Sequence, residues 1–172
     1  METRKRKGTK RVFVTVGTTQ FDKLIETMCS EDTLKALQML GYSNLLLQRG
    51  CGQYDPPSTT GDGMFVDHYR YKSNIREDIE QADLVISHAG AGSCLETLGA
   101  GRKLLVVINE GLMDNHQLEL ANQLHLDGHL HYCTCSTLVQ TLRTKNFTNL
   151  KPFPPGKPEV FAQYLDNLMG FT

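Results

Sequence analysis

Short apolar runs alternate with helical patterns along most of this chain, and that alternation constrains its fold more than any other feature. Between the runs, apolar residues keep helical spacing, as in Phe21, Leu24, Ile25 and Met28. Strands that alternate with helices predict a doubly wound α/β fold built on a parallel sheet. The predicted strands are Val12–Val16, Leu45–Gln48, Met64–Val66, Leu84–Ser87, Leu104–Ile108 and, less clearly, Leu130–Cys133.

The 172 residues suffice for one well-buried domain but not for two. We expect a basic, disordered leader over residues 1–11, a folded domain over 12–150, and a proline-rich turn with an amphipathic C-terminal helix over 151–172. A formal net charge of −1 argues against a nucleic-acid binder. The chain has no apolar run long enough for a signal or membrane segment, so we expect a cytosolic protein, with weak attraction of the leader to an anionic membrane as an alternative role.

The segment Leu84–Thr97 carries the clearest signal for a ligand. Its strand runs into a small-residue turn and then into a helix that is predicted to open at Ser93. The N–H groups and positive dipole end of such a helix attract phosphate, and Gly90 and Gly92 let a diphosphate approach the backbone. His88, at the strand end, is placed to donate to a phosphate oxygen. A tight turn without a ligand is the alternative.

Glu96 has two interpretations. It is the last residue of an S-x-x-E capping box that starts at Ser93, where it satisfies a backbone N–H group. One turn into a phosphate-binding helix, it is also placed to accept from both hydroxyls of a ribose. A dinucleotide fingerprint is excluded because Leu95 replaces its third glycine, and the chain has no G-K-[ST] phosphate loop.

The segment Val106–Ala121 brings a second polar cluster to the same edge of the predicted sheet. Asp114–Gln117 has the form of a capping box, so a helix is expected to begin there. The side chains of Asn115, His116 and Gln117 suit sugar hydroxyls, which need both donors and acceptors. Capping alone is the alternative for Gln117, and a solvated position is the alternative for His116.

A zinc site formed by the histidines and cysteines near residue 130 is disfavoured. Residues two apart along a strand lie roughly 7 Å apart, too far for four of them to bind one ion. We therefore expect no metal there, and a strand with buried cysteine and half-exposed histidines. The five cysteines, an odd number at irregular spacing, predict reduced thiols. The residues concerned are His125, His129, His131, Cys133 and Cys135.

The segments Val14–Phe21, Ile86–Ser93 and Asn115–Glu119 together closely resemble the family of catalytic subunits of the eukaryotic dolichol-pathway UDP-N-acetylglucosamine transferase. The resemblance extends from about Val12 to the terminal helix. Those subunits are similar to the donor-binding half of a GT-B glycosyltransferase, such as the C-terminal domain of the bacterial peptidoglycan enzyme that transfers GlcNAc to a lipid-linked sugar. The resemblance implies a Rossmann-like half-domain of GT-B C-terminal type.

The resemblance also implies a role for each matching segment. It places two loops near the donor phosphates: Gly17, Thr18 and Thr19, and Gln48, Arg49 and Gly50. It places Tyr71 and Lys72 where the bacterial relative holds uracil. It assigns the diphosphate to His88, Gly90, Ala91, Gly92 and Ser93, the ribose to Glu96, and the GlcNAc hydroxyls to His116 and Gln117, beside Asn115. His88 and Glu96 are the catalytic candidates, positioning the leaving group and the donor.

The implied activity is inverting transfer of GlcNAc from UDP-GlcNAc to GlcNAc-diphosphodolichol, in β1,4 linkage, at the cytosolic face of the endoplasmic reticulum, without metal or cofactor. A GT-B enzyme needs two Rossmann-like domains, roughly twice what this chain supplies. We therefore expect a heterodimer with a membrane-anchored subunit that binds the dolichol-linked acceptor and carries the general base. The alternatives are a non-catalytic nucleotide-sugar-binding regulatory subunit and, more distantly, a UDP-sugar epimerase of GT-B type.

Overall fold

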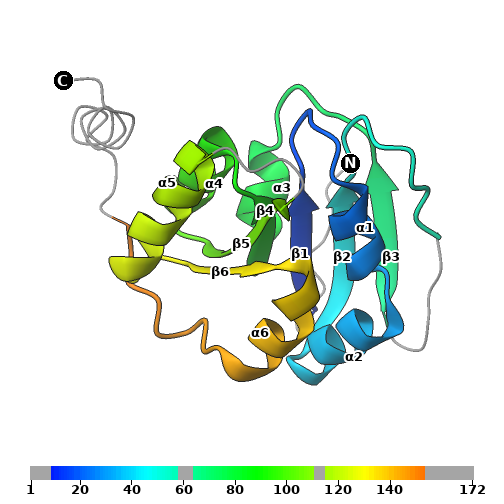
Figure 1. Ribbon diagram of the computed structural model, residues 1–172. Coiled ribbons are helices and arrows are strands. Elements are labelled where there is room, and N and C mark those ends of the chain that lie inside the picture. Colours follow the sequence, from blue (N-terminus) through cyan, green and yellow to red (C-terminus); the bar gives the residue numbers. More distant parts are fainter. Residues whose placement is uncertain (1–8, 58–63, 111–114, 154–172) are drawn as a thin grey trace.

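The computed structural model describes residues 9–57, 64–110 and 115–153. Its strands form one parallel sheet in the order β3-β2-β1-β4-β5-β6 (Figure 1). Every predicted strand is present, with ends shifted by at most three residues, and the doubly wound α/β fold is confirmed. The strands are β1 (Lys10–Thr15), β2 (Tyr42–Gln48), β3 (Phe65–Tyr69), β4 (Leu84–His88), β5 (Lys103–Ile108) and β6 (His131–Thr134).

Helices cover both faces of the sheet (Figure 1). The helices α1, α2 and α6 pack on one face and α3, α4 and α5 on the other. The sequence pattern did not predict α6. The helices are α1 (Asp22–Met28), α2 (Glu31–Met39), α3 (Arg76–Gln81), α4 (Ala91–Gly99), α5 (Asn115–Leu126) and α6 (Leu138–Thr144), with the short 3₁₀ helix η2 (Cys135–Thr137) before α6.

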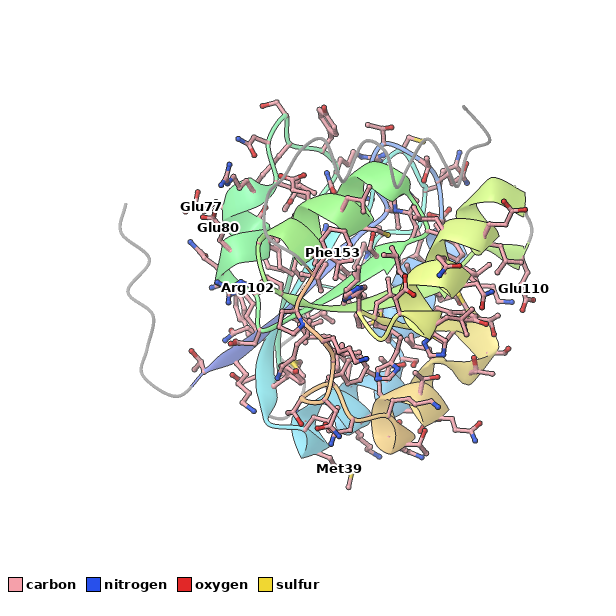
Figure 2. All side chains as sticks on the ribbon, turned by 90° about the vertical axis from the view of Figure 1, so that its left-hand side faces the viewer. Met39, Glu77, Glu80, Arg102, Glu110 and Phe153 are labelled. Carbon is pink, nitrogen blue, oxygen red and sulfur yellow. The ribbon has the colours of Figure 1, made fainter. Side chains whose placement is uncertain are left out.

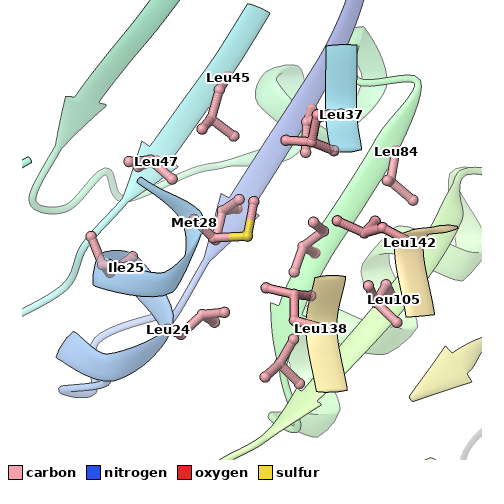
Figure 3. Close-up of a cluster of buried hydrophobic side chains, with 14 of the residues drawn as sticks. Leu24, Ile25, Met28, Leu37, Leu45, Leu47, Leu84, Leu105, Leu138 and Leu142 are labelled. Atoms are coloured by element: carbon pink, nitrogen blue, oxygen red, sulfur yellow. The ribbon is translucent and has the colours of Figure 1, made fainter. Parts of the chain in front are cut away.

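Alternating side chains of the central strand feed two hydrophobic cores. Val12 and Val14 of β1 belong to the core beneath α1, α2 and α6, whereas Phe13 belongs to the core beneath α3, α4 and α5. Figure 3 shows the first core, in which Met28 and Leu142 approach the sheet from different helices. All three β1 side chains are fully buried, as expected for a strand covered on both sides.

The strand order reverses at β1, which pairs with β2 on one side and β4 on the other. Such a reversal opens a crevice beyond the carboxyl ends of the strands, where open α/β sheets bind ligands. The loops after β1, β2, β3 and β4 all reach this edge of the sheet. The fold therefore places the candidate segments of the sequence analysis together.

Two predicted segments are not covered by the structure. The leader up to residue 8 and the predicted C-terminal helix lie outside the described residues. Every helix within residues 9–57, 64–110 and 115–153 is too short or too polar to span a bilayer. All five cysteines lie within the described residues, and none forms a disulfide.

Candidate functional site

A pocket of about 200 Å³ opens at the carboxyl ends of the strands. Four segments that are distant in the sequence build it: the loop after β1, the end of β2, the loop after β3 and the helix α4 after β4. The volume is below the roughly 300–1,000 Å³ of sites that enclose whole drug-sized ligands. The pocket is thus one wall of a site rather than a complete enclosure. Its lining residues are Gly17, Gln48, Tyr71, Lys72, Ser73, Asn74, Ile75 and Glu96.

Gln48 is held in this pocket by a buried hydroxyl. The Thr15 hydroxyl, at the end of β1, donates to Oε1 of Gln48 and accepts from the backbone N–H of Gly17 at 3.1 Å. Thr15 and Gln48 are 0% and 1% exposed, so both polar side chains depend on protein partners. With Oε1 turned to Thr15, Gln48 has its amide N–H donors available for an oxygen-rich ligand.

The imidazole of His88 lies between two glycines. A Cβ atom at Gly90 would come within 2.4 Å of Nε2, and one at Gly17 within 3.2 Å of Cε1. Burial lowers the pKa of His88, and the backbone carbonyl of Thr15 partly opposes this by favouring the protonated form. The two glycines therefore admit a ring that is held beside the loop after β1 and the start of α4.

The helix α4 begins at Ala91, so the predicted opening at Ser93 is wrong. Gly90 is the N-cap and contributes no side-chain hydrogen bond, so the first N–H groups of α4 have no side-chain cap. The predicted S-x-x-E capping box is wrong as well, because Ser93 already lies in the first turn. Glu96 falls in the second turn, exposed at the pocket and electrostatically coupled to Arg76. Its capping role is removed, which leaves its carboxylate available for a ligand.

A tight turn forms the loop after β1. The N–H and the hydroxyl of Thr19 both donate to the carbonyl of Val16, at 3.2 and 2.7 Å. Gly17 has φ +62°, in the left-handed region that favours glycine, and the Thr18 side chain is exposed. The turn presents Gly17 to the pocket and leaves Thr18 at the surface.

Gly50, in the neighbouring loop, packs against this turn, whereas the Arg49 side chain points elsewhere. Gly50 has φ +63°, and a Cβ atom there would come within 2.2 Å of the carbonyl oxygen of Thr19. Only glycine permits such a close approach of the two loops. The guanidinium of Arg49 does not line the pocket; it donates to the carbonyl of Tyr54 at 3.2 Å and lies 3.7 Å from Asp55.

Lys72 is anchored by a buried carboxylate. Its Nζ lies 3.1 Å from Oδ2 of Asp78, which also accepts from the Tyr69 hydroxyl at 2.6 Å. The same ammonium lies 4.3 Å from the centre of the Tyr69 ring. Burial and the bond to Asp78 raise the pKa of Tyr69, so its hydroxyl stays protonated. These contacts fix the loop after β3, in which Tyr71 is 59% exposed beside the pocket.

The structure brings most of the candidate residues to one edge of the sheet, though not the whole set. The side chains of Ala91, Asn115, His116 and Gln117 lie outside the described part, although α4 and α5 begin at Ala91 and Asn115. Sequence reasoning missed Thr15 and three lining residues: Ser73, Asn74 and Ile75. The signals available were a threonine inside an apolar run and the position of the other three in the loop between β3 and α3.

The histidines near residue 130 bind backbone carbonyls. Each of the three distances is 3.1 Å: from His125 Nδ1 to the carbonyl oxygen of Leu130, from His129 Nδ1 to that of Lys151, and from His131 Nε2 to that of Asn146. Among the residues that the structure describes, no three His, Cys, Asp or Glu side chains are grouped so as to hold a metal ion.

Comparison with known proteins gives a consistent result. A family model described as the glycosyltransferase family 28 C-terminal domain matches residues 11–167. The UDP-N-acetylglucosamine transferase subunit ALG13 of Homo sapiens is 54% identical over 148 residues, 86% of this chain. The protein of the same name from Mus musculus is 56% identical over 129 residues, 75% of this chain. The matches span only 13% of the human relative and 11% of the mouse relative. The Saccharomyces cerevisiae protein of the same name is 29% identical, and that match spans 91% of this chain and 94% of that relative.

Solved structures agree on the fold. An NMR solution structure of ALG13 has a TM-score of 0.67 and 28% identity, and the match covers 91% of this chain and 95% of that one. The crystal structure of Acinetobacter baumannii MurG has a TM-score of 0.62 and 22% identity. That match covers 83% of this chain but only 43% of the MurG chain. This chain therefore corresponds in fold to a part of MurG.

Proposed function

The chain belongs to the glycosyltransferase family 28 C-terminal domain family, as its sequence motifs predicted, and on this basis we propose that it is the donor-binding, catalytic subunit of an N-acetylglucosaminyltransferase. The donor is UDP-GlcNAc and the acceptor is GlcNAc-diphosphodolichol, with inversion to a β1,4 linkage. The observation that carries this proposal is the convergence of Gly17, Gln48, Tyr71–Ile75 and Glu96 on one pocket beside His88.

The pocket has the chemistry that such a donor requires. The uncapped start of α4 offers N–H groups and a positive dipole end to the diphosphate. Gln48 offers amide donors, and the Glu96 carboxylate accepts from ribose hydroxyls. We assign the uracil base to Tyr71 and to the anchored loop of Lys72, both of which line the pocket. The sugar itself is assigned to Asn115, His116 and Gln117 at the start of α5.

In the proposed reaction the acceptor 4-hydroxyl attacks the anomeric carbon as the bond to the UDP oxygen breaks. Negative charge then builds on the departing diphosphate, where the N-terminus of α4 stabilises it electrostatically. His88 is held beside this helix start by Gly90 and Gly17 and donates to the diphosphate when protonated. No step requires a metal or cofactor. The acceptor proton passes to a base on the partner.

The size of the pocket supports the need for a partner. At about 200 Å³ it leaves much of a nucleotide sugar uncovered, and the comparable MurG chain is more than twice as long as its matching part. We propose a heterodimer with a membrane-anchored, acceptor-binding subunit, assembled at the cytosolic face of the endoplasmic reticulum.

The test is transfer of GlcNAc from UDP-GlcNAc to a GlcNAc-diphospholipid by the full chain, with and without its co-purifying membrane subunit. We expect transfer only in the complex. His88→Ala is expected to lower the rate about 100-fold, the usual effect of losing one transition-state donor. Glu96→Gln is expected to raise the KM for UDP-GlcNAc about tenfold, since hydrogen bonds to charged groups are the stronger ones. Glu31→Gln, an exposed residue of α2 paired with Lys35, is the matched control.

Two results would contradict the proposal. Full activity of the complex with both His88→Ala and Glu96→Ala would show that the reaction occurs elsewhere. UDP-GlcNAc binding without transfer in any complex would favour the alternative, a non-catalytic regulatory subunit that binds nucleotide sugars.

A further inference from the structure

A second pocket lies at the opposite end of the sheet, where the proposed transfer reaction makes no use of it. It encloses about 180 Å³ and is lined by Lys10, Tyr42, Asp83, Gly101, Arg102 and Lys103. These residues begin β1, β2 and β5 or directly precede β4 and β5. Because all the strands are parallel, the pocket lies a full strand length away from the donor pocket.

The lining of this amino-end pocket is strongly basic. Among the described lining residues, three positive charges, those of Lys10, Arg102 and Lys103, stand against the one carboxylate of Asp83. One oxygen of that carboxylate is already engaged, since Asp83 Oδ2 accepts from the backbone N–H of Arg11 at 2.8 Å. The Lys10 ammonium lies 5.8 Å from the centre of the Tyr42 ring. The pocket therefore keeps an excess of positive charge.

Arg102 has a hydrogen-bond donor that the protein does not satisfy. Its Nε is buried and has no partner among the described residues. In Figure 2, Arg102 lies on the side where β1 begins, with Glu77 and Glu80 of α3 above it. Both glutamates are engaged elsewhere: Glu80 pairs with Arg76 at 2.9 Å, and Glu77 accepts from the Gln81 amide at 3.0 Å. A buried guanidinium N–H without a partner indicates a site for an external acceptor.

We propose that this pocket binds a phosphate group. Guanidinium presents a planar fork of donors that matches phosphate oxygens, and Lys10 and Lys103 add charge around the same space. The volume of about 180 Å³ is sufficient for one phosphate group. The phosphate comes either from a small soluble phosphate compound or from a lipid headgroup. This inference is independent of the transferase activity.

The first measurement is a titration of the full chain with inorganic phosphate, followed by backbone amide NMR. A sodium chloride series of equal ionic strength controls for general screening. We expect saturable shifts at Asp83, Gly101, Arg102 and Lys103 with phosphate and not with chloride. Equal shifts in the two series, or none with phosphate, would overturn the proposal.

Three variants locate the binding. Arg102→Gln and, separately, Lys103→Gln are each expected to weaken phosphate binding about tenfold, the usual size of one charge-assisted hydrogen bond. Asp83→Asn removes the one carboxylate among the described lining residues and is expected to tighten binding severalfold. Arg143→Gln, an exposed arginine of α6 outside the pocket, removes the same charge and is expected to change nothing. Equal weakening by Arg143→Gln and by the two pocket variants would overturn the assignment to this pocket.

Sedimentation with phosphatidylcholine vesicles, with and without phosphatidic acid, distinguishes the two sources. A lipid headgroup predicts binding to the phosphatidic acid vesicles that Arg102→Gln reduces. A soluble compound predicts the NMR shifts and no effect of Arg102→Gln on vesicle binding. The wild type and Arg102→Gln carry the same basic residues before Lys10, so those residues contribute equally to the vesicle binding of the two proteins. The difference in vesicle binding between the wild type and Arg102→Gln therefore reports on the pocket alone.

Discussion

The imidazole of His88 packs directly against Gly90, and a methyl group at position 90 would come within 2.4 Å of its Nε2. This contact joins the end of β4 to the residue that caps α4. The lack of a side chain at position 90 thus determines where the ring lies, in addition to shaping the turn.

Gly90→Ala is expected to displace the imidazole of His88 and to weaken UDP binding about tenfold or more. Fitting the extra methyl into a packed site also lowers the free energy of unfolding by about 1–3 kcal/mol. Isothermal titration with UDP and urea denaturation measure the two effects. Gly99→Ala, in the same helix and with nothing within 4 Å of its Cβ, is the control and is expected to stabilise the protein by about 0.5–1 kcal/mol.

Gly92→Ala tests whether the diphosphate itself contacts the start of α4. Nothing in the protein lies within 4 Å of a Cβ atom at this position, so stability is expected to hold or rise. A diphosphate on the backbone at residue 92 would meet the new methyl group, and UDP binding is therefore expected to fall. Unchanged UDP affinity in Gly92→Ala would place the diphosphate elsewhere.

The lowered pKa of His88 predicts a pH dependence of stability. An unfolded histidine has a pKa of about 6.5, so below this pH the unfolded chain binds a proton that folded His88 resists. Stability is then lost as pH falls below about 6.5 and is fully present above it. Urea denaturation from pH 5 to 8 should give a shallower decline for His88→Gln than for the wild type. Parallel curves would mean that His88 titrates normally.

Much of the fold was predictable because a parallel sheet that is covered on both faces leaves a strong sequence signal. Buried strands read as continuous apolar runs, such as Leu104–Ile108 in β5, and the spacing of Phe21, Leu24 and Met28 is helical. The signal is weaker for α6, because one of its buried residues is the polar Thr141. The Ser93 capping box failed because glycine N-caps leave no side-chain pattern and the competing S-x-x-E match lay three residues on.

The segments that form the site could be predicted from the sequence more fully than the roles of the individual residues in them. Gly17, Gln48 and Glu96 line the pocket, as their place after strands predicted. The supporting contacts were not predictable, because they join residues that are separated in the sequence. Thr15 binds Gln48, 33 positions away, and Asp78 binds Tyr69, 9 positions away. The Arg49 side chain turns toward Tyr54. This direction depends on tertiary packing and not on the spacing of residues in the sequence.

Tyr69→Phe is expected to destabilise the loop after β3. The hydroxyl donates to the buried Asp78 carboxylate at 2.6 Å. Its loss leaves that carboxylate with the Lys72 ammonium, at 3.1 Å, as its remaining partner among the described residues. A hydrogen bond to a charged group contributes about 1.5–3 kcal/mol, so urea denaturation should show a loss of that order. Tyr71→Phe, at an exposed tyrosine of the same loop, is the stability control and should show no change.

Thr15→Val is expected to reduce both stability and donor binding, because one hydroxyl serves two groups. The substitution keeps the shape of the side chain but leaves Oε1 of Gln48 and the N–H of Gly17 without their partner. Unsatisfied buried groups cost about 1–3 kcal/mol each, which urea denaturation detects. UDP affinity should fall as well, since Gln48 and Gly17 both line the pocket. Thr141→Val, in which the lost hydroxyl bond is to the carbonyl of Thr137, the N-cap residue of α6, should cost less and leave UDP affinity unchanged. Equal effects of the two variants would remove Thr15 from the site.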